Sequence, residues 1–183
     1  MRIASTATLV WLAACAGTGQ IDVGVTASSQ LAQETTTTEP EAAPRLMVTV
    51  ERVDVQIGDE TAEDGGWVTV FTGPTEVDLR DAASAEVFLG GAEVPVGRVT
   101  QVRLILADDA VLVTGEDEQI VSCPSCQETG IKIVTRGQLA VAEGETLSLQ
   151  VVFDTAASLT ASLDGLRLSP VIRLEKADEP DAP

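Results

Sequence analysis

The chain has 183 residues, a formal net charge of −18, 44% hydrophobic but only 3% aromatic residues, and neither histidine nor tyrosine. The absence of histidine excludes Ser-His-Asp and Cys-His catalysis and removes the most frequent zinc ligand. The negative charge disfavours contact with phosphate backbones and anionic lipid surfaces, so no nucleic-acid partner is expected. Because so few residues are aromatic, the core is expected to be aliphatic.

The first 14 residues have the features of a signal peptide. Arg2 precedes a short apolar stretch that ends in Leu12-Ala13-Ala14-Cys15. This order is similar to the lipobox of bacterial lipoproteins, in which the cysteine is acylated and the leader is cut before it. We therefore predict a lipid on Cys15, which anchors an exported protein on the periplasmic or cell-surface face of a membrane, the outer membrane where there is one. An ordinary leader followed by a chance cysteine is the alternative.

Residues 15–45 are predicted to be an acidic tether rich in Thr, Pro and Ala. The segment contains no aromatic residue and includes the run Thr35-Thr36-Thr37-Thr38, a composition that buries too little surface to fold. A flexible coil of this length has a reach on the order of 30 Å, which would hold the rest of the protein clear of the membrane. The folded domain is expected over residues 46–175, followed by an acidic tail at 176–183.

Short apolar runs with period-two alternation fill residues 46–175. In the first run, the alternation changes phase at Glu51-Arg52, which predicts a bulged strand. Asp81 to Leu89 is Ala-rich and precedes Gly90-Gly91, so it is predicted to be the one short helical turn. Further strands are predicted near residues 66–71, 77–79, 99–106, 110–114, 120–121, 131–135, 138–141, 147–153 and 166–174. About eight or nine short strands at this spacing predict an all-β fold, an antiparallel β-sandwich.

Several of these runs also resemble a known family. The matching stretches are Gly66-Trp67-Val68-Thr69-Val70, Val77-Asp78-Leu79, Leu89-Gly90, Thr100-Gln101-Val102-Arg103-Leu104, Thr129-Gly130-Ile131-Lys132-Ile133, Val152-Phe153-Asp154 and Leu168-Ser169-Pro170-Val171-Ile172-Arg173. In this order they are similar to the domain of unknown function 4382 of bacterial and archaeal envelope proteins. The chain departs from the family pattern at Val99, where an aromatic is frequent, and in a Cys pair that interrupts a common Pro-Ser-Gly loop. The resemblance implies a lipoprotein sandwich domain without an assigned activity.

The sharpest local motif is Cys123-Pro124-Ser125-Cys126. A thioredoxin-like redox pair requires a helix N-terminus, but the motif lies between β segments with no helical pattern after it. A zinc site requires two further ligands, and Cys15 is expected to be acylated. We therefore predict a local disulfide between Cys123 and Cys126, as suits an oxidising envelope, and leave a thiol-redox protein or a metal site as alternatives.

Acidic residues cluster in predicted turns, at Asp59-Glu60, Glu63-Asp64, Asp108-Asp109 and Glu116-Asp117-Glu118. Loops at one end of a sandwich could bring them together around calcium, but none has EF-hand spacing, and solvated turns are the simpler interpretation. No metal ligand and no cofactor are predicted. Trp67 is the best candidate for a sugar-stacking platform, although it could equally pack against a neighbouring strand.

These features predict a non-enzymatic, lipid-anchored envelope module that binds or scaffolds a partner, possible partners being other envelope proteins. An accessory domain for glycan or calcium and an envelope thiol-redox protein are the two alternatives.

Overall fold

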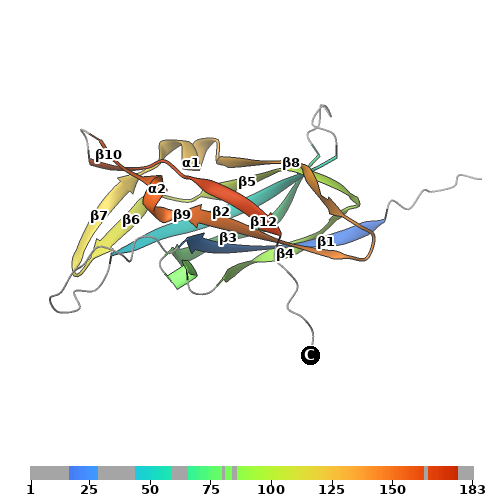
Figure 1. Ribbon diagram of the computed structural model, residues 1–183, viewed down its shortest axis with the longest axis horizontal. Coiled ribbons are helices and arrows are strands. Elements are labelled where there is room, and N and C mark those ends of the chain that lie inside the picture. The colour runs from blue at the N-terminus through green and yellow to red at the C-terminus, as the bar shows by residue number, and fades with distance from the viewer. Residues whose placement is uncertain are drawn as a thin grey trace, which may run out of the picture.

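The computed structural model describes residues 17–28, 44–58, 66–79, 81–83, 86–162 and 165–176, which form a β-sandwich of two mixed sheets (Figure 1). The predicted all-β sandwich is confirmed, but its sheets are mixed and not purely antiparallel as predicted, because each contains one parallel pair of strands. Twelve strands lie within these residues, more than the eight or nine expected. The excess comes partly from a strand outside the predicted domain and partly from the stretch after residue 86, predicted as helical.

The smaller sheet is built around the N-terminal strand. Its strand order is β12 (Ile172–Lys176), β9 (Thr146–Asp154), β1 (Thr18–Ser28) and β4 (Val87–Pro95). β1 runs antiparallel to β4 and parallel to β9, with Gln20 opposite Thr146 and Ser28 opposite Asp154. Because β1 has a neighbour on each side, it satisfies the backbone groups of both β4 and β9.

The prediction that residues 15–45 form only a tether is therefore wrong for residues 18–28. Ile21, Val23 and Val25 alternate along β1 and are completely buried. The strand partners of β1 begin at Val87 and Thr146, so nothing nearby in the sequence indicates a pairing. The folded domain begins at Thr18, not at residue 46, while residues 29–43 lie outside the described part of the chain.

The larger sheet has eight strands and is organised by β2 (Arg45–Ile57). On one edge, β2 pairs with β3 (Trp67–Asp78). On the other edge, β5 (Gly97–Leu106) and β6 (Ala110–Thr114) lie end to end along it. The remaining strands are β8 (Ile131–Val141), beside β5, then β7 (Asp117–Ser122), beside β6, followed by β11 (Gly165–Leu168) and β10 (Leu159–Ser162).

The phase change predicted in the first strand is present. The registers of β2 with β3 and with β5 both shift between Val50 and Arg52. One extra residue at Glu51 allows Val50 and Val53 both to point into the core, where each is fully buried.

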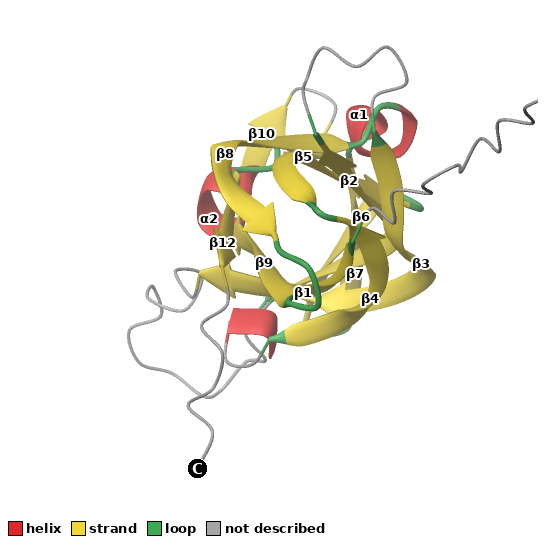
Figure 2. Ribbon diagram, turned by 90° about the vertical axis from the view of Figure 1, so that its right-hand side faces the viewer, coloured by secondary structure: helices red, strands yellow, loops and turns green. Residues whose placement is uncertain are grey.

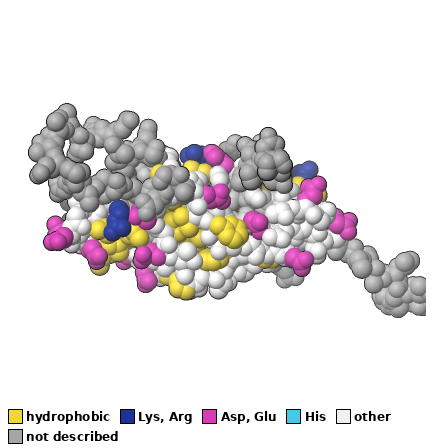
Figure 3. Space-filling model, turned by 90° about the horizontal axis from the view of Figure 1, so that it is seen from below, with side chains coloured by type: hydrophobic (Ala, Val, Ile, Leu, Met, Phe, Trp, Pro, Cys, Tyr) yellow, Lys and Arg dark blue, Asp and Glu magenta, His cyan; other side chains and the backbone are white. Residues whose placement is uncertain are grey.

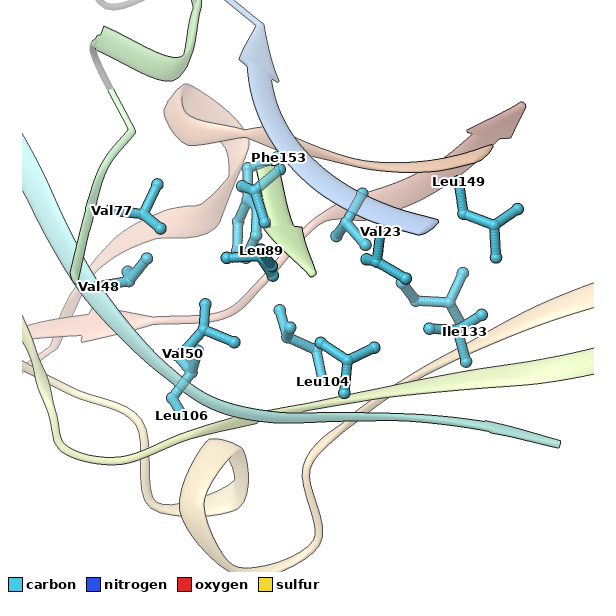
Figure 4. Packing of buried hydrophobic residues seen from close by; sticks show 14 of the residues in the cluster. Val23, Val48, Val50, Val77, Leu89, Leu104, Leu106, Ile133, Leu149 and Phe153 are labelled. Atoms are coloured by element: carbon cyan, nitrogen blue, oxygen red, sulfur yellow. The ribbon is translucent and has the colours of Figure 1, made fainter. Parts of the chain in front are cut away.

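The core lies between the two sheets and is almost entirely aliphatic, as the composition predicts. Figure 4 shows Val23, Leu149 and Phe153 of the smaller sheet pointing toward Val50 and Leu104 of the larger sheet. Phe153 is fully buried and is the largest fully buried side chain among the described residues.

Helical structure within the described residues is limited to three short segments: the 3-10 turn Asp81–Ala83, α1 (Pro124–Glu128) and α2 (Thr155–Ser158). The predicted helical turn at Asp81–Leu89 is thus only partly correct, because β4 begins at Val87. Leu89 is buried and Phe88 is exposed, which is strand alternation. None of the described helices has the length and apolarity to cross a membrane.

Candidate functional site

The Cys123-Cys126 pair lies at the start of α1. Cys123 is the N-cap residue, Pro124 occupies the first turn and Cys126 lies one turn on. The expectation that no helix follows the motif is therefore wrong. Proline is favoured in the first helical turn because its fixed φ suits that position and no intrahelical partner for its missing N–H is needed there. A helix of five residues is too short to produce a periodic apolar pattern in the sequence.

The two sulfur atoms lie at disulfide distance, and the Cα atoms are 5.4 Å apart, within the range that a disulfide requires. Both cysteines are buried, at 1% and 0% exposure. Asp109 holds the motif against the sheet: its Oδ1 atom accepts hydrogen bonds from the backbone N–H of Cys123 (3.0 Å) and from Nε2 of Gln127 (3.2 Å). Thiol exchange requires access to a sulfur atom, so this environment favours a structural cross-link over a redox pair.

Replacing both cysteines by serine is expected to lower the free energy of unfolding by at least about 2 kcal/mol, because chain entropy gives about 2 kcal/mol for so small a loop and the two serine hydroxyls are buried in addition. Urea denaturation with and without reductant measures this. Reductant should destabilise the natural chain by about 2 kcal/mol, the loop contribution alone, and leave the double variant unchanged. Ser125→Ala, at an exposed position of the same motif, is the matched control. Equal stability of the natural and doubly substituted chains would show that no bond forms.

Trp67 lies on the side of the larger sheet that faces away from the core. The guanidinium carbon of Arg103 is 4.3 Å from the centroid of its ring, and Trp67 is only half-buried. A cation packed on an aromatic face stabilises both side chains, and it leaves at most one face of this ring for a sugar. The arrangement favours the packing interpretation of Trp67 over a glycan platform.

A buried carboxylate organises the strands next to this pair. Asp54 is 5% exposed and accepts hydrogen bonds from Oγ1 of Thr69 (2.8 Å) and Nε of Arg52 (3.1 Å). In the register of β2 with β5, Asp54 stands directly opposite Arg103. The ion pair with Arg52 and the hydrogen bond from Thr69 compensate the burial of the Asp54 charge, so these contacts are consistent with a structural role.

Sequence reasoning missed the most exposed aromatic side chain of the described residues. Phe88 is 62% exposed because it lies on the outer side of β4, a segment that was predicted to be helical. Its position could have been found from the alternation of Val87, Phe88 and Leu89. Phe88 lies in the smaller sheet and Trp67 in the larger.

The acidic clusters do not form a cation site within the described residues. Asp109 is engaged by α1, and Glu116 lies at the tip of the β6–β7 hairpin, where Thr114 stands opposite Asp117. Over the described ranges there is no group of three or more Cys, Asp or Glu side chains that could hold a metal ion. The clusters at residues 59–60 and 63–64 lie outside these ranges, as does Cys15.

An open groove of about 550 Å³ lies between β8 and β12. These two strands are the outer edges of the larger and the smaller sheet, respectively. Figure 2 shows them side by side on one flank of the sandwich. The groove is lined by Ile133, Val134, Thr135, Leu139, Ile172, Arg173, Leu174 and Lys176.

Residues 19–170 match the family model of the Domain of unknown function (DUF4382). The chain belongs to this family. The match begins within β1 and thus agrees with a domain that includes the N-terminal strand. The resemblance noted from the sequence alone is confirmed. Neither a curated protein nor a solved structure matched the chain.

Proposed function

We propose that this DUF4382 protein is a lipid-anchored, non-catalytic binding module of the bacterial cell envelope. The observation that carries the proposal is the position of Leu12-Ala13-Ala14-Cys15 immediately before β1, with only Ala16 and Gly17 between the cysteine and the first strand. The lack of histidine in the whole chain supports a binding role over general acid–base catalysis.

With only two residues between Cys15 and β1, the domain would stand directly on the membrane and not at the end of a long tether. Three fully extended residues span roughly 10 Å, so a lipid on Cys15 holds the start of β1 at the membrane surface and leaves no long tether. Two turns meet the chain at this end: the N–H of Val96 donates to the carbonyl oxygen of Gly17 (3.1 Å), and the N–H of Gly144 donates to that of Thr18 (2.9 Å).

In this proposal the long axis of the sandwich rises from the membrane. The β4–β5 and β8–β9 turns lie next to the lipid, and the tip of the β6–β7 hairpin points away from it, at the opposite end of Figure 1. Figure 2 looks onto the end that would face the membrane. The flanks, including the β8–β12 groove, then face sideways and are open to neighbouring molecules.

Labelling with radioactive palmitate in a bacterial host tests the anchor. The natural chain is expected to take up the label and to sediment with membranes, because several acyl chains hold a protein durably. Cys15→Ser should lose the label and leave the membrane fraction. The Cys123→Ser, Cys126→Ser double variant is the matched control and should keep both properties. A natural chain without label, or a labelled Cys15→Ser chain, would contradict the proposal.

A further inference from the structure

We infer that the β8–β12 groove binds an extended acidic segment of a partner polypeptide, which adds as a strand to the free edge of β12. This inference deepens the proposed function, because it names the chemistry of the partner that the module would bind.

The free edge of β12 differs from the other sheet edges. β4 contains Gly90-Gly91 and ends at Pro95, and β3 contains Pro74. Prolines and glycines are usual means of preventing edge pairing. β10 has four residues and β12 has five, so length does not separate these two edges, but of the two only β12 borders the groove. β8 is interrupted by a register shift opposite Val99 and Gln101, whereas β12 runs in unbroken register beside β9. A row of backbone donors and acceptors is therefore available along β12.

The groove offers an apolar floor to a strand laid in it. Ile133 is 9% exposed, Leu139, Ile172 and Leu174 are half-buried, and Val134 at the rim is 57% exposed. A strand paired with β12 would turn every second side chain toward this floor, since side chains alternate between the faces of a strand. The alternate residues of the partner would therefore be apolar.

The charges on the two strands determine the remaining residues of the partner. The protein has 29 acidic residues and only two lysines. Of these two lysines, Lys176 lines the groove together with Arg173, so the charged lining residues are both cations. Lys132 directly precedes the lining residue Ile133 on β8. Lys132 and Lys176 are both exposed. Neither has an ion-pair partner among the described residues, whereas Arg173 binds Glu175 at 2.6 Å. By contrast, Asp and Glu side chains are spread over the face shown in Figure 3. A partner with acidic residues between its apolar ones complements this arrangement.

The acidic segment at residues 177–183 of the same chain is a weaker occupant. It starts directly after Lys176 and would have to reverse direction to enter the groove. It also contains Pro180 and Pro183, which cannot donate to a ladder of backbone hydrogen bonds. For these reasons, a segment supplied by another molecule is the better occupant of the groove.

The probe for the test is a fluorescent ten-residue peptide of alternating Glu and Val, added to the mature chain, residues 15–183, with Cys15→Ser. Fluorescence anisotropy should report saturable binding that weakens with salt, and a Lys-Val peptide should not bind. Lys132→Glu with Lys176→Glu should weaken binding on the order of tenfold or more. The matched control is Arg98→Glu with Arg167→Glu, which makes the same charge change at exposed positions outside the groove and should have a much smaller effect.

Several results would overturn the inference. The first is that the acidic peptide does not bind. The second is that both double variants lose the same amount of peptide affinity. The third is that the affinity is unchanged when the peptide amides that would face β12 are methylated. A chain ending at Lys176 that binds the peptide far more tightly than the full chain would assign the groove to the chain's own tail. Because this assay uses a chain without lipid, its outcome is independent of palmitate labelling, which tests the anchor alone.

Discussion

A truncated chain that begins at Pro44 is expected to lack a cooperative unfolding transition, although it contains the whole of the domain predicted from composition. The truncation removes Ile21, Val23 and Val25, all fully buried in the core. Burial of side chains of this size contributes about 1.5–3 kcal/mol each. Their sum approaches the whole stability of a small domain, typically about 5–15 kcal/mol. The truncation also exposes the inner edges of β4 and β9, which invites aggregation.

Circular dichroism and urea denaturation would measure this effect. A chain that begins at Gly17 is the control, because it loses only residues before β1, and it should unfold in one transition. If the chain starting at Pro44 unfolded with the same midpoint and the same denaturant dependence, β1 would be dispensable and the original tether interpretation would be restored.

The parts of the fold that sequence reasoning predicted correctly depend on local patterns. The bulge at Glu51 is encoded in β2 itself, where two alternating runs change phase within a few residues. β1 carries an equally regular pattern in Ile21, Val23 and Val25, but it is a single strand followed by a Thr- and Pro-containing segment. Its pairing with β9 is parallel and joins opposite ends of the domain, so only the tertiary fold reveals it.

The candidate sites, too, could be predicted where they depend on a local sequence pattern and not where they depend on the tertiary fold. The cysteine pair was predicted from its spacing, and the sulfur atoms lie at disulfide distance, but the short helix that contains Cys126 was not predicted. The β8–β12 groove could not be predicted, since it requires the edges of two different sheets to meet. Lys132 falls in a predicted strand, but Lys176 was assigned to the acidic tail at 176–183, whereas it is the last residue of β12.

The two ends of the domain are expected to lie at very different heights above the membrane. β5 and β6 run end to end along β2 from the Val96 turn toward the hairpin that contains Glu116. At about 3.3 Å per residue, this path is about 50 Å long. A fluorophore on Val96→Cys of the lipidated chain should therefore be quenched by a spin-labelled zwitterionic lipid, and one on Glu116→Cys should not. Both positions are exposed turns, so labelling should not disturb the core.

A lengthened chain provides the control for this comparison. Inserting about 20 Gly and Ser residues between Ala16 and Gly17 gives a flexible linker with a reach of roughly 25 Å. The linker frees the domain to tumble, so the difference in quenching between the two positions should largely disappear, while palmitate labelling is unchanged.

Depth-dependent quenching at Val96 and Glu116 is therefore the most direct measurement of the central claim, that a DUF4382 sandwich begins immediately after its lipid anchor and stands on the membrane. The account predicts strong quenching at Val96, none at Glu116, and loss of the difference in the lengthened chain. Equally weak quenching at both positions of the natural lipidated chain would contradict it.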